Sequence, residues 1–390
     1  MPLLIEGVDV IMKFLLEDYL KELEYLVNFD SGSLVPEGTA KVADYFTEKF
    51  TYLGWNVIRH DIGDKVGPCL EITNTNTDHY DLLLIGHMDT VFPRGTAKER
   101  PMHQDAEKVY GQGVNDMKAS LLSAYYCLGM LQAEGALAGK SVCVLMNSDE
   151  ELSSIYSRPL IEKIATKSSY AIILEPARKG GEMVNKRRGV ARYELQCSGI
   201  AAHAGVNPQD GSSAINELAH WIIALHSQSD LAKGTSVNVG VIGGGTTPNT
   251  IAPNAFGRVD VRFTDLAAID SLEALMRDLE QHPKTPGGAK VSVTGGVTRP
   301  PMNPSSKTLA LCDDITKLAK EIGVDFRWIA TGGGSDASFT AALGVPTVDG
   351  FGPVGGGAHT EAEYLVTMTI EPRLQLLKVT ANHILNNLIK

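Results

Sequence analysis

Short apolar runs that end abruptly in charged residues are the feature that most restricts the fold of this sequence. Each run is shorter than a typical helix, is rich in Val, Ile or Leu and is bounded by polar loops, as buried strands are. Segments with helical spacing lie between them. This alternation predicts an α/β fold, with a mainly parallel sheet and helices on both faces. The three clearest runs are LLLIG at 82–86, VCVLM at 142–146 and AIIL at 171–174.

A second pattern begins near Arg188 and predicts an inserted domain. From there to residue 299 the chain reads as strand, helix, two strands, helix and strand, which is the order of a ferredoxin-like α+β domain. The apolar α/β pattern then resumes at residue 308. We therefore predict a small domain at 188–299, inserted into a larger domain formed by 1–187 and 300–390.

Charge and composition exclude several classes of protein. The net charge is −11 and no basic patch stands out, so nucleic-acid binding is not expected. The five cysteines are widely spaced and form no CxxC pair, which argues against a disulfide framework. No apolar run reaches membrane-spanning length. The N-terminal segment reads as an amphipathic helix, with residues 1–11 an appended extension if Met12 is the natural start. We expect a soluble cytoplasmic protein with no nucleic-acid or membrane partner.

Potential metal ligands follow each of the three apolar runs. His87 and Asp89 follow the first run, Glu150 and Glu151 the second, and Glu175 the third. Because ligands bind at the carboxyl ends of the strands in such sheets, we expect these side chains to converge. His87 and Asp89 are two residues apart, so one can bind a metal ion while the other orients the imidazole ring.

Two further candidates, Asp116 in GQGVNDMK and His359 in GGGAHT, lie in glycine-rich segments. Singly, each feature has an ordinary explanation: Asp116 could cap a helix, and the run Asp149–Glu151 could be a solvated turn. Together they favour a metal site. Oxygen and nitrogen ligands without sulfur suit zinc, or else cobalt or manganese. Five ligands exceed what one catalytic zinc needs, so we expect two zinc ions that share a carboxylate and offset the repulsion among the acids.

From VNFDSGS at 27–33 to HTEAEYL at 359–365, the sequence resembles the co-catalytic zinc exopeptidases and amidohydrolases. This family includes glutamate carboxypeptidase (carboxypeptidase G-type), acetylornithine deacetylase, succinyl-diaminopimelate desuccinylase and the aminoacylases. The resemblance implies that two zinc ions are held by five residues, with Asp116 bridging both. The ligands so implied are His87, Asp116 and Glu175 for one ion, and Asp116, Glu151 and His359 for the other.

The resemblance also assigns the catalytic roles. Asp89 would clamp the imidazole of His87, and Glu150 would act as the general base. A cis peptide bond is implied between Asp116 and Met117. The family usually has glycine two residues after the second glutamate, where this sequence has Ser153.

In the family the inserted domain forms a homodimer and carries a histidine that enters the active site of the other subunit. The motif GIAAHAGVNP nominates His203 as that oxyanion donor. The resemblance implies that Asn249, Arg262 and Arg299 hold the terminal carboxylate of the substrate. It also implies that Gly333 presents its backbone to the substrate. Arginine suits a carboxylate through its bidentate fork, although a surface ion pair is the alternative explanation for both arginines.

The resemblance therefore implies a di-zinc hydrolase that cleaves an amide bond next to a free carboxylate. The motifs TGGGSDA and VTRPPM favour a glutamate carboxypeptidase-like metallopeptidase that releases a C-terminal amino acid from a small peptide. The alternative is a deacylase of N-acyl amino acids. A non-catalytic relative would have lost a ligand or the base, and every one is present.

Overall fold

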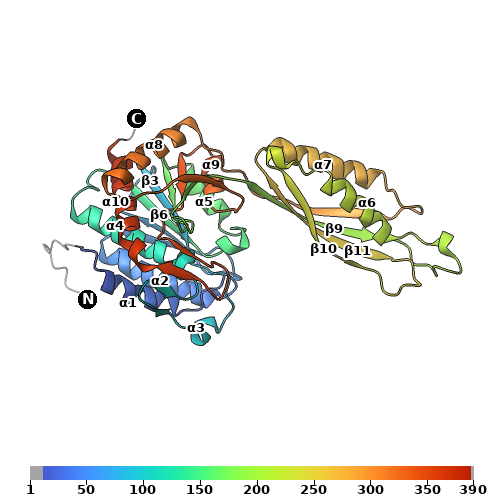
Figure 1. Cartoon of the computed structure of the whole chain (residues 1–390), viewed down its shortest axis with the longest axis horizontal. Coiled ribbons are helices and arrows are strands. Elements are labelled where there is room, and N and C mark those ends of the chain that lie inside the picture. Colours follow the sequence, from blue (N-terminus) through green and yellow to red (C-terminus); the bar gives the residue numbers. More distant parts are fainter. Residues whose placement is uncertain (1–11, 388–390) are drawn as a thin grey trace. The chain divides into compact units, whose positions relative to one another are not determined.

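The computed structural model describes residues 12–387, and the first eleven residues of the N-terminal segment predicted to be helical lie outside them. The chain divides into two compact units (Figure 1). The large unit comprises Met1–Lys186, Pro304–Ala330 and Ser335–Lys390, and the inserted unit comprises Arg187–Asn303 and Thr331–Gly334. The sequence predicts an inserted domain at 188–299 and assigns Thr331–Gly334 to the large domain, whereas the structure groups these four residues with the inserted unit. Within residues 12–387, no helix has the length and apolar character needed to cross a membrane.

An eight-stranded sheet forms the centre of the large unit, in the order β1-β2-β6-β3-β7-β14-β8-β13. The four central strands β6, β3, β7 and β14 are parallel, and antiparallel pairs flank them. The central strands are buried along their whole length, as their continuous apolar runs require. The bounds are β1 Asn56–His60, β2 Cys69–Thr73, β3 Leu82–His87, β6 Val142–Asn147, β7 Ala171–Ile173, β8 Met183–Arg187, β13 Trp328–Thr331 and β14 Thr347–Asp349.

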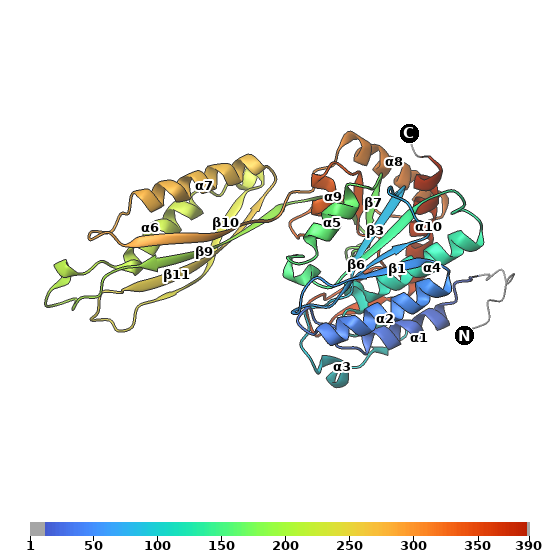
Figure 2. The same cartoon turned by 180° about the vertical axis from the view of Figure 1, so that it is seen from behind.

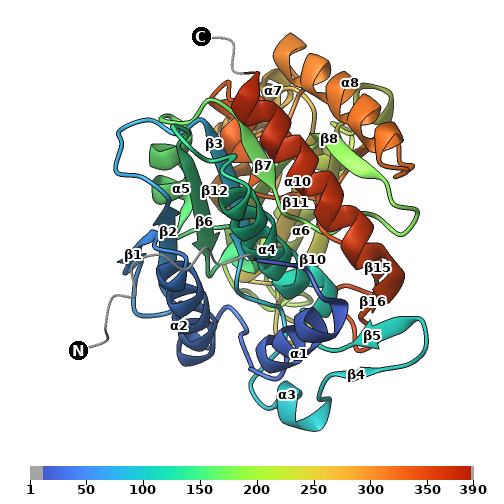
Figure 3. The same ribbon diagram turned by 90° about the vertical axis from the view of Figure 1, so that its left-hand side faces the viewer.

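Helices cover both faces of this sheet, as the sequence predicts. Figures 1 and 2 show α4 and α10 on one side of the central strands and α5 and α9 on the other; Figure 3 looks onto the side of α4 and α10. Helix α4 is buried on every side from Ala119 to Leu131, because it is apolar all round and packs between the sheet and its neighbouring helices. The bounds are α1 Leu16–Val27, α2 Pro36–Tyr52, α3 Thr96–Glu99, α4 Ala119–Ala133, α5 Arg158–Ala165, α8 Ser306–Glu321, α9 Ala337–Ala342 and α10 Ile370–Asn386.

A second, small sheet in the large unit joins distant parts of the chain. Its order is β15-β16-β5-β4, with antiparallel pairing throughout. It places the segment before Asp116 beside the segment after His359. The bounds are β4 His103–Gln104, β5 Lys108–Tyr110, β15 Gly355–Gly356 and β16 Tyr364–Val366.

The inserted unit is the ferredoxin-like domain that the sequence predicts. Its chain order is β9-α6-β10-β11-α7-β12 and its antiparallel sheet has the order β10-β11-β9-β12. From Ala191 onward, alternate residues of β9 are buried, because one face of the sheet packs on the helices, around Trp221 and Phe263. The bounds are β9 Gly189–Ser198, α6 Ala214–His226, β10 Ser236–Gly244, β11 Asn254–Phe263, α7 Leu266–Gln281 and β12 Lys290–Arg299.

Candidate metal centre

Three neighbouring parallel strands bring the predicted ligands to one edge of the large sheet. His87 is the last residue of β3 and pairs in register with Asn147, the last residue of β6. Glu150 begins a short helical turn three residues beyond β6, and Glu175 follows β7 by two residues. Because β6, β3 and β7 are adjacent and parallel, their carboxyl ends meet.

Asp116 lies at the centre of this group, between the two predicted histidines. Its Oδ1 is 3.1 Å from Nε2 of His87, and its Oδ2 is 3.4 Å from Nε2 of His359. The same His359 nitrogen is 3.1 Å from Oε2 of Glu151. On the other side, Oε1 of Glu175 is 3.9 Å from Nε2 of His87. One carboxylate therefore has one oxygen directed at each histidine, which is the arrangement of a carboxylate that bridges two ions.

The charges within this group are crowded. Burial raises the pKa of Glu175 well above its ordinary value, and the negative charges of Asp116 and Glu150 raise it further. His359 forms one hydrogen bond with Asp116 and another with Glu151. These two bonds, the one with Asp116 most strongly, raise the pKa of His359 to about 10. Positive charge placed among these acids is thus strongly favoured. A divalent cation supplies such charge in a compact form.

The donor atoms fit divalent metal ions of the zinc type. Two triplets of side chains could each hold an ion, because the ligand atoms within each triplet lie within 4.8 Å of one another. One triplet is His87, Glu150 and Glu175, and the other is His87, Asp116 and Glu151. All five cysteines are free, buried thiols, and none belongs to either triplet. Carboxylate oxygens and imidazole nitrogens without thiolates suit zinc, cobalt or manganese. The peptide bond between Asp116 and Met117 is cis, as the resemblance implies.

Asp89 connects the histidine strand to the turn that carries the glutamates. The Nδ1 atom of His87 is 2.9 Å from the main-chain oxygen of Asp89 and 3.5 Å from its carboxylate. The carboxylate itself accepts hydrogen bonds from the Ser33 hydroxyl at 2.6 Å and from the main-chain N–H groups of Glu150 and Glu151 at 3.2 Å. The carbonyl is therefore the nearer partner of the ring, and the carboxylate fixes the glutamate turn. Ser33 was not singled out as a site residue, although it lies in the VNFDSGS motif.

The acidic run after β6 is not a solvated turn, because Asp149 is buried and Glu150 and Glu151 are half-buried. Asp149 is fully buried, and its Oδ2 accepts hydrogen bonds from the main-chain N–H groups of Tyr156 at 2.7 Å and Ser157 at 3.3 Å. Ser153 has φ 68°, a left-handed conformation that glycine adopts most readily. The serine found here in place of the family glycine therefore occupies a left-handed backbone position, while Glu151 stays beside His359.

The other predicted site residues all belong to the inserted unit and fall into two groups. His203 and Asn249 lie in adjacent loops. The main-chain N–H of Ala204 donates a hydrogen bond to the main-chain carbonyl oxygen of Asn249 at 2.9 Å. Arg262 forms a bidentate ion pair with Asp260, at 2.8 and 3.0 Å, and donates to the Gly332 oxygen at 3.3 Å.

Arg299 is buried and packs against the same glycine segment. A Cβ atom on Gly334 would lie 2.7 Å from Cδ of Arg299, so this segment approaches the arginine closely. Gly333 is in the middle of the segment, and its carbonyl accepts a hydrogen bond from Arg187 at 3.0 Å.

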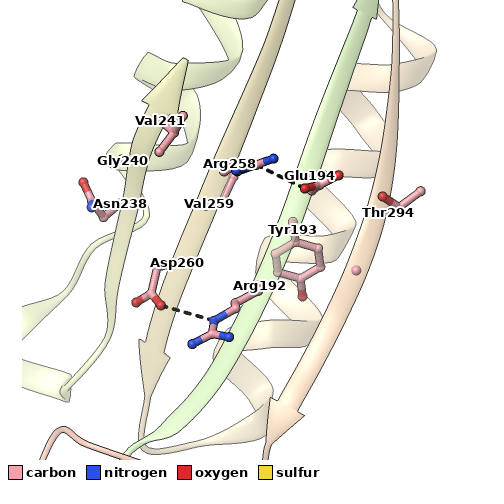
Figure 4. Close-up of a pocket in the computed structure, with 11 residues that line it drawn as sticks. Arg192, Tyr193, Glu194, Asn238, Gly240, Val241, Arg258, Val259, Asp260 and Thr294 are labelled. Atoms are coloured by element: carbon pink, nitrogen blue, oxygen red, sulfur yellow. Dashed lines mark ion pairs between the residues drawn. The ribbon is translucent and has the colours of Figure 1, made fainter. Parts of the chain in front are cut away.

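A pocket on the open face of the inserted sheet contains none of the predicted residues (Figure 4). Its charged side chains pair with one another: Arg258 with Glu194 at 3.2 Å, and Arg192 with Asp260 at 4.0 Å. The pocket therefore offers little unbalanced charge to a ligand.

Comparison with known proteins assigns this chain to a family. Residues 83–383 match the model of peptidase family M20/M25/M40. The chain is 31% identical to carboxypeptidase G2 of Pseudomonas sp. (strain RS-16) over 365 residues, covering 92% of this chain and 87% of that one. It is 28% identical to succinyl-diaminopimelate desuccinylase of Paraburkholderia xenovorans (strain LB400), covering 79% and 83%.

Solved structures share the fold. Aminopeptidase PepT from Bacillus cereus ATCC 10987 has a TM-score of 0.78 at 23% identity, covering 95% of this chain and 99% of that one. The M20 family metallo-carboxypeptidase Sso-CP2 from Sulfolobus solfataricus has a TM-score of 0.75 at 18% identity, covering 94% and 99%. The resemblance drawn from the motifs is confirmed. The chain belongs to peptidase family M20/M25/M40 and is a metal-dependent peptidase or amidohydrolase.

Proposed function

We propose that this protein is a two-zinc carboxypeptidase that releases a C-terminal amino acid from small peptides. The position of Asp116, with one oxygen directed at His87 and the other at His359, is the observation that carries the proposal. His87, Asp116 and Glu175 would hold one ion, and Asp116, Glu151 and His359 the other. The likeness to carboxypeptidase G2 over 92% of the chain supports peptide cleavage. The likeness to the desuccinylase supports a second candidate, an N-acyl-amino-acid deacylase.

Glu150 is the proposed general base. Bound divalent ions would lower the pKa of a water molecule and polarise the carbonyl of the scissile amide. Glu150 takes a proton from that water as the oxygen adds to the carbonyl carbon, and then gives the proton to the leaving nitrogen. Its main-chain N–H is held by Asp89 at 3.2 Å, so the turn presents its side chain from a fixed backbone.

Arg262, Arg299, Asn249 and Gly333 are the proposed substrate-binding groups. Arg262 is already paired with Asp260, which fixes the plane of its guanidinium and partly neutralises its charge. A substrate carboxylate would therefore meet an oriented fork rather than a mobile one.

A substrate panel tests the reaction. We expect peptides with a free C-terminal glutamate to be cleaved, and the same peptides with an amidated C-terminus to resist cleavage. Removal of metal with a chelator should abolish the activity, and zinc should restore it. These rates are measured by release of the amino acid. A higher kcat/KM for N-acetyl or N-succinyl amino acids than for peptides would favour the deacylase, and cleavage of neither would contradict both candidates.

We also propose that the chain forms a homodimer through the inserted unit, so that His203 and Asn249 serve the active site of the other subunit. Strand β10 is at the edge of its sheet, and edge strands are free to pair with another chain. Large apolar side chains are exposed on α6 and β10. They include Ile223, which is 72% exposed, and Ile242, which is 60% exposed. Helix α6 packs against β10, and exposed apolar groups on such adjoining elements are typical of association surfaces.

Replacing Ile223 with Asp should weaken this dimer by about tenfold or more, because a charge replaces an apolar group worth roughly 1.5–3 kcal/mol when buried. Activity should fall with the dimer, while metal content stays unchanged. Sedimentation at several protein concentrations measures the association. Leu309→Asp is the matched control, since Leu309 is 48% exposed on α8 of the large unit. A wild-type monomer that is fully active would contradict the proposal.

A further inference from the structure

Glu363 is a buried carboxylate that no prediction assigned to the site. Its side chain is 2% exposed and accepts three main-chain hydrogen bonds, each 2.9 Å long. The donors are the N–H groups of Gly113, Asn115 and Asp116. Glu363 is 247 residues away from Asp116 in sequence, yet it binds that residue's own backbone. It is also four residues after His359, in the same loop.

The backbone around Glu363 is fixed independently. Strand β16 begins at Tyr364, which pairs with Tyr110 of β5. The main-chain N–H of Gly111 donates a hydrogen bond to the main-chain carbonyl oxygen of Glu363 at 3.4 Å. The carboxylate is therefore held on a short two-stranded ladder that ends just before the Asp116 turn.

Close packing joins the same two segments. A Cβ atom on Gly355 would lie 2.2 Å from Oδ1 of Asn115, so the backbone that leads to His359 lies directly against the Asp116 turn. Gly357 has φ +70°, and a Cβ atom there would lie 2.4 Å from the oxygen of Ala362. Gly355 is needed for this approach and Gly357 for the tight turn within the His359 loop, and neither position tolerates a side chain without a shift of its neighbours.

A carboxylate buried in this way is costly unless its oxygens are well hydrogen-bonded. Hydrogen bonds from N–H groups to an ionised carboxylate are among the stronger ones in proteins, and three of them offset much of that cost. All three come from one turn, Gly113–Asp116, so the carboxylate orders that turn as a unit.

We propose that Glu363 is a positioning residue of the metal centre; the inference rests on the proposed function. Its carboxylate fixes the turn that contains Asp116, and the loop that contains Glu363 also contains His359. Glu363 thus sets the register between a ligand that serves both ions and a ligand that serves one. It acts through main-chain groups and is not one of the proposed ligands.

Glu363→Gln tests this role. The glutamine side chain keeps the volume but has one acceptor oxygen, so its NH2 group faces at least one main-chain N–H donor. We expect the affinity for zinc, measured by competition with a chelating dye, to fall about 10- to 100-fold, as it does when residues behind metal ligands are changed. The absorption spectrum of the cobalt-substituted protein should change, because the ligand geometry changes.

Glu217→Met is the control for loss of a buried carboxylate that binds main-chain groups. Glu217 is also fully buried, and its Oε2 accepts main-chain N–H bonds from Lys284 at 2.9 Å and Thr285 at 2.7 Å, within the inserted unit. This variant leaves both main-chain donors without an acceptor, so it should lower the unfolding temperature but leave zinc affinity and the cobalt spectrum as in the wild type. An equal loss of zinc affinity in the Glu217 variant would overturn the inference, because general destabilisation would then explain both.

The remaining outcomes separate the inference from the proposed function. A Glu363→Gln protein with wild-type zinc affinity and cobalt spectrum overturns the positioning role, whatever its unfolding temperature. A wild-type protein that binds no divalent cation contradicts the proposed function itself. If Glu363→Gln does not fold, Glu363→Asp gives the same test: it keeps the charge but is one methylene shorter. Weaker zinc binding is again expected, and wild-type affinity again overturns the role.

Discussion

Glu150→Gln should lower kcat by about 10²- to 10⁴-fold while the protein keeps its metal ions. Glutamine has the shape of glutamate but cannot accept a proton at neutral pH, so water activation and protonation of the leaving nitrogen both fail. The main-chain N–H of Glu150 still donates to Asp89, and the turn should keep its conformation. Steady-state kinetics and metal analysis of the same preparation measure the two effects.

Metal content decides how this result is interpreted. Glu150 lies within 4.8 Å of ligand atoms of His87 and Glu175, so it is close enough to act as a ligand itself. Loss of one metal ion in the Glu150 variant would show that role and contradict its assignment as the base. Glu162→Gln is the control, because Glu162 forms a surface ion pair with Arg158 at 2.7 Å and should tolerate the change.

The convergence of His87, Glu150 and Glu175 could be expected from sequence because it follows from topology. Each residue comes after a continuous apolar run, and such runs form the central parallel strands of an α/β sheet. The carboxyl ends of adjacent parallel strands meet, whatever the loops between them do. The order of elements in the inserted unit was likewise readable from its alternating periodicity.

Asp116 and His359 could not be placed by the same reasoning. Both lie in glycine-rich loops; the sequence offered each as a candidate ligand, but only the resemblance to a known family assigned them to a shared ion. The structure brings His359 within 3.4 Å of Asp116 through the small β15-β16-β5-β4 sheet. Pairing between two- and three-residue strands leaves almost no trace in sequence periodicity.

Ser33 and Glu363 were missed for a related reason. Ser33 bonds to Asp89, 56 residues away, and Glu363 bonds to main-chain groups about 250 residues away. A main-chain donor has no side-chain signature, so a sequence gives no hint of which carboxylate will bind it. The Ser33 hydroxyl pairs with a distant side chain, and no periodicity marks that pairing either. Acids that follow a metal-ligand motif by a few residues, as Glu363 follows His359, are the nearest thing to a signal.

Asp116→Ala should remove more metal than any other single change at the centre. Each of the other proposed ligands serves one ion, whereas the two Asp116 oxygens are directed at His87 and His359 on opposite sides. We expect zinc content to fall well below two per subunit and turnover to fall by more than about 10³-fold, since metal-activated water and Glu150 chemistry are both lost. Glu175→Ala, by comparison, should weaken one ion only.

Thermal unfolding gives a readout of this loss that does not depend on turnover. An ion that binds only the folded chain stabilises it by RT ln(1 + [L]/Kd), which is about 2.7 kcal/mol at a hundredfold excess over Kd. Zinc should therefore raise the unfolding temperature of the wild type and leave that of Asp116→Ala nearly unchanged. Asp314→Ala is the control, because Asp314 also pairs with a histidine, His383 at 3.3 Å, but at the surface of the large unit. If zinc stabilised Asp116→Ala as strongly as the wild type, a shared carboxylate could not be what holds the two ions together.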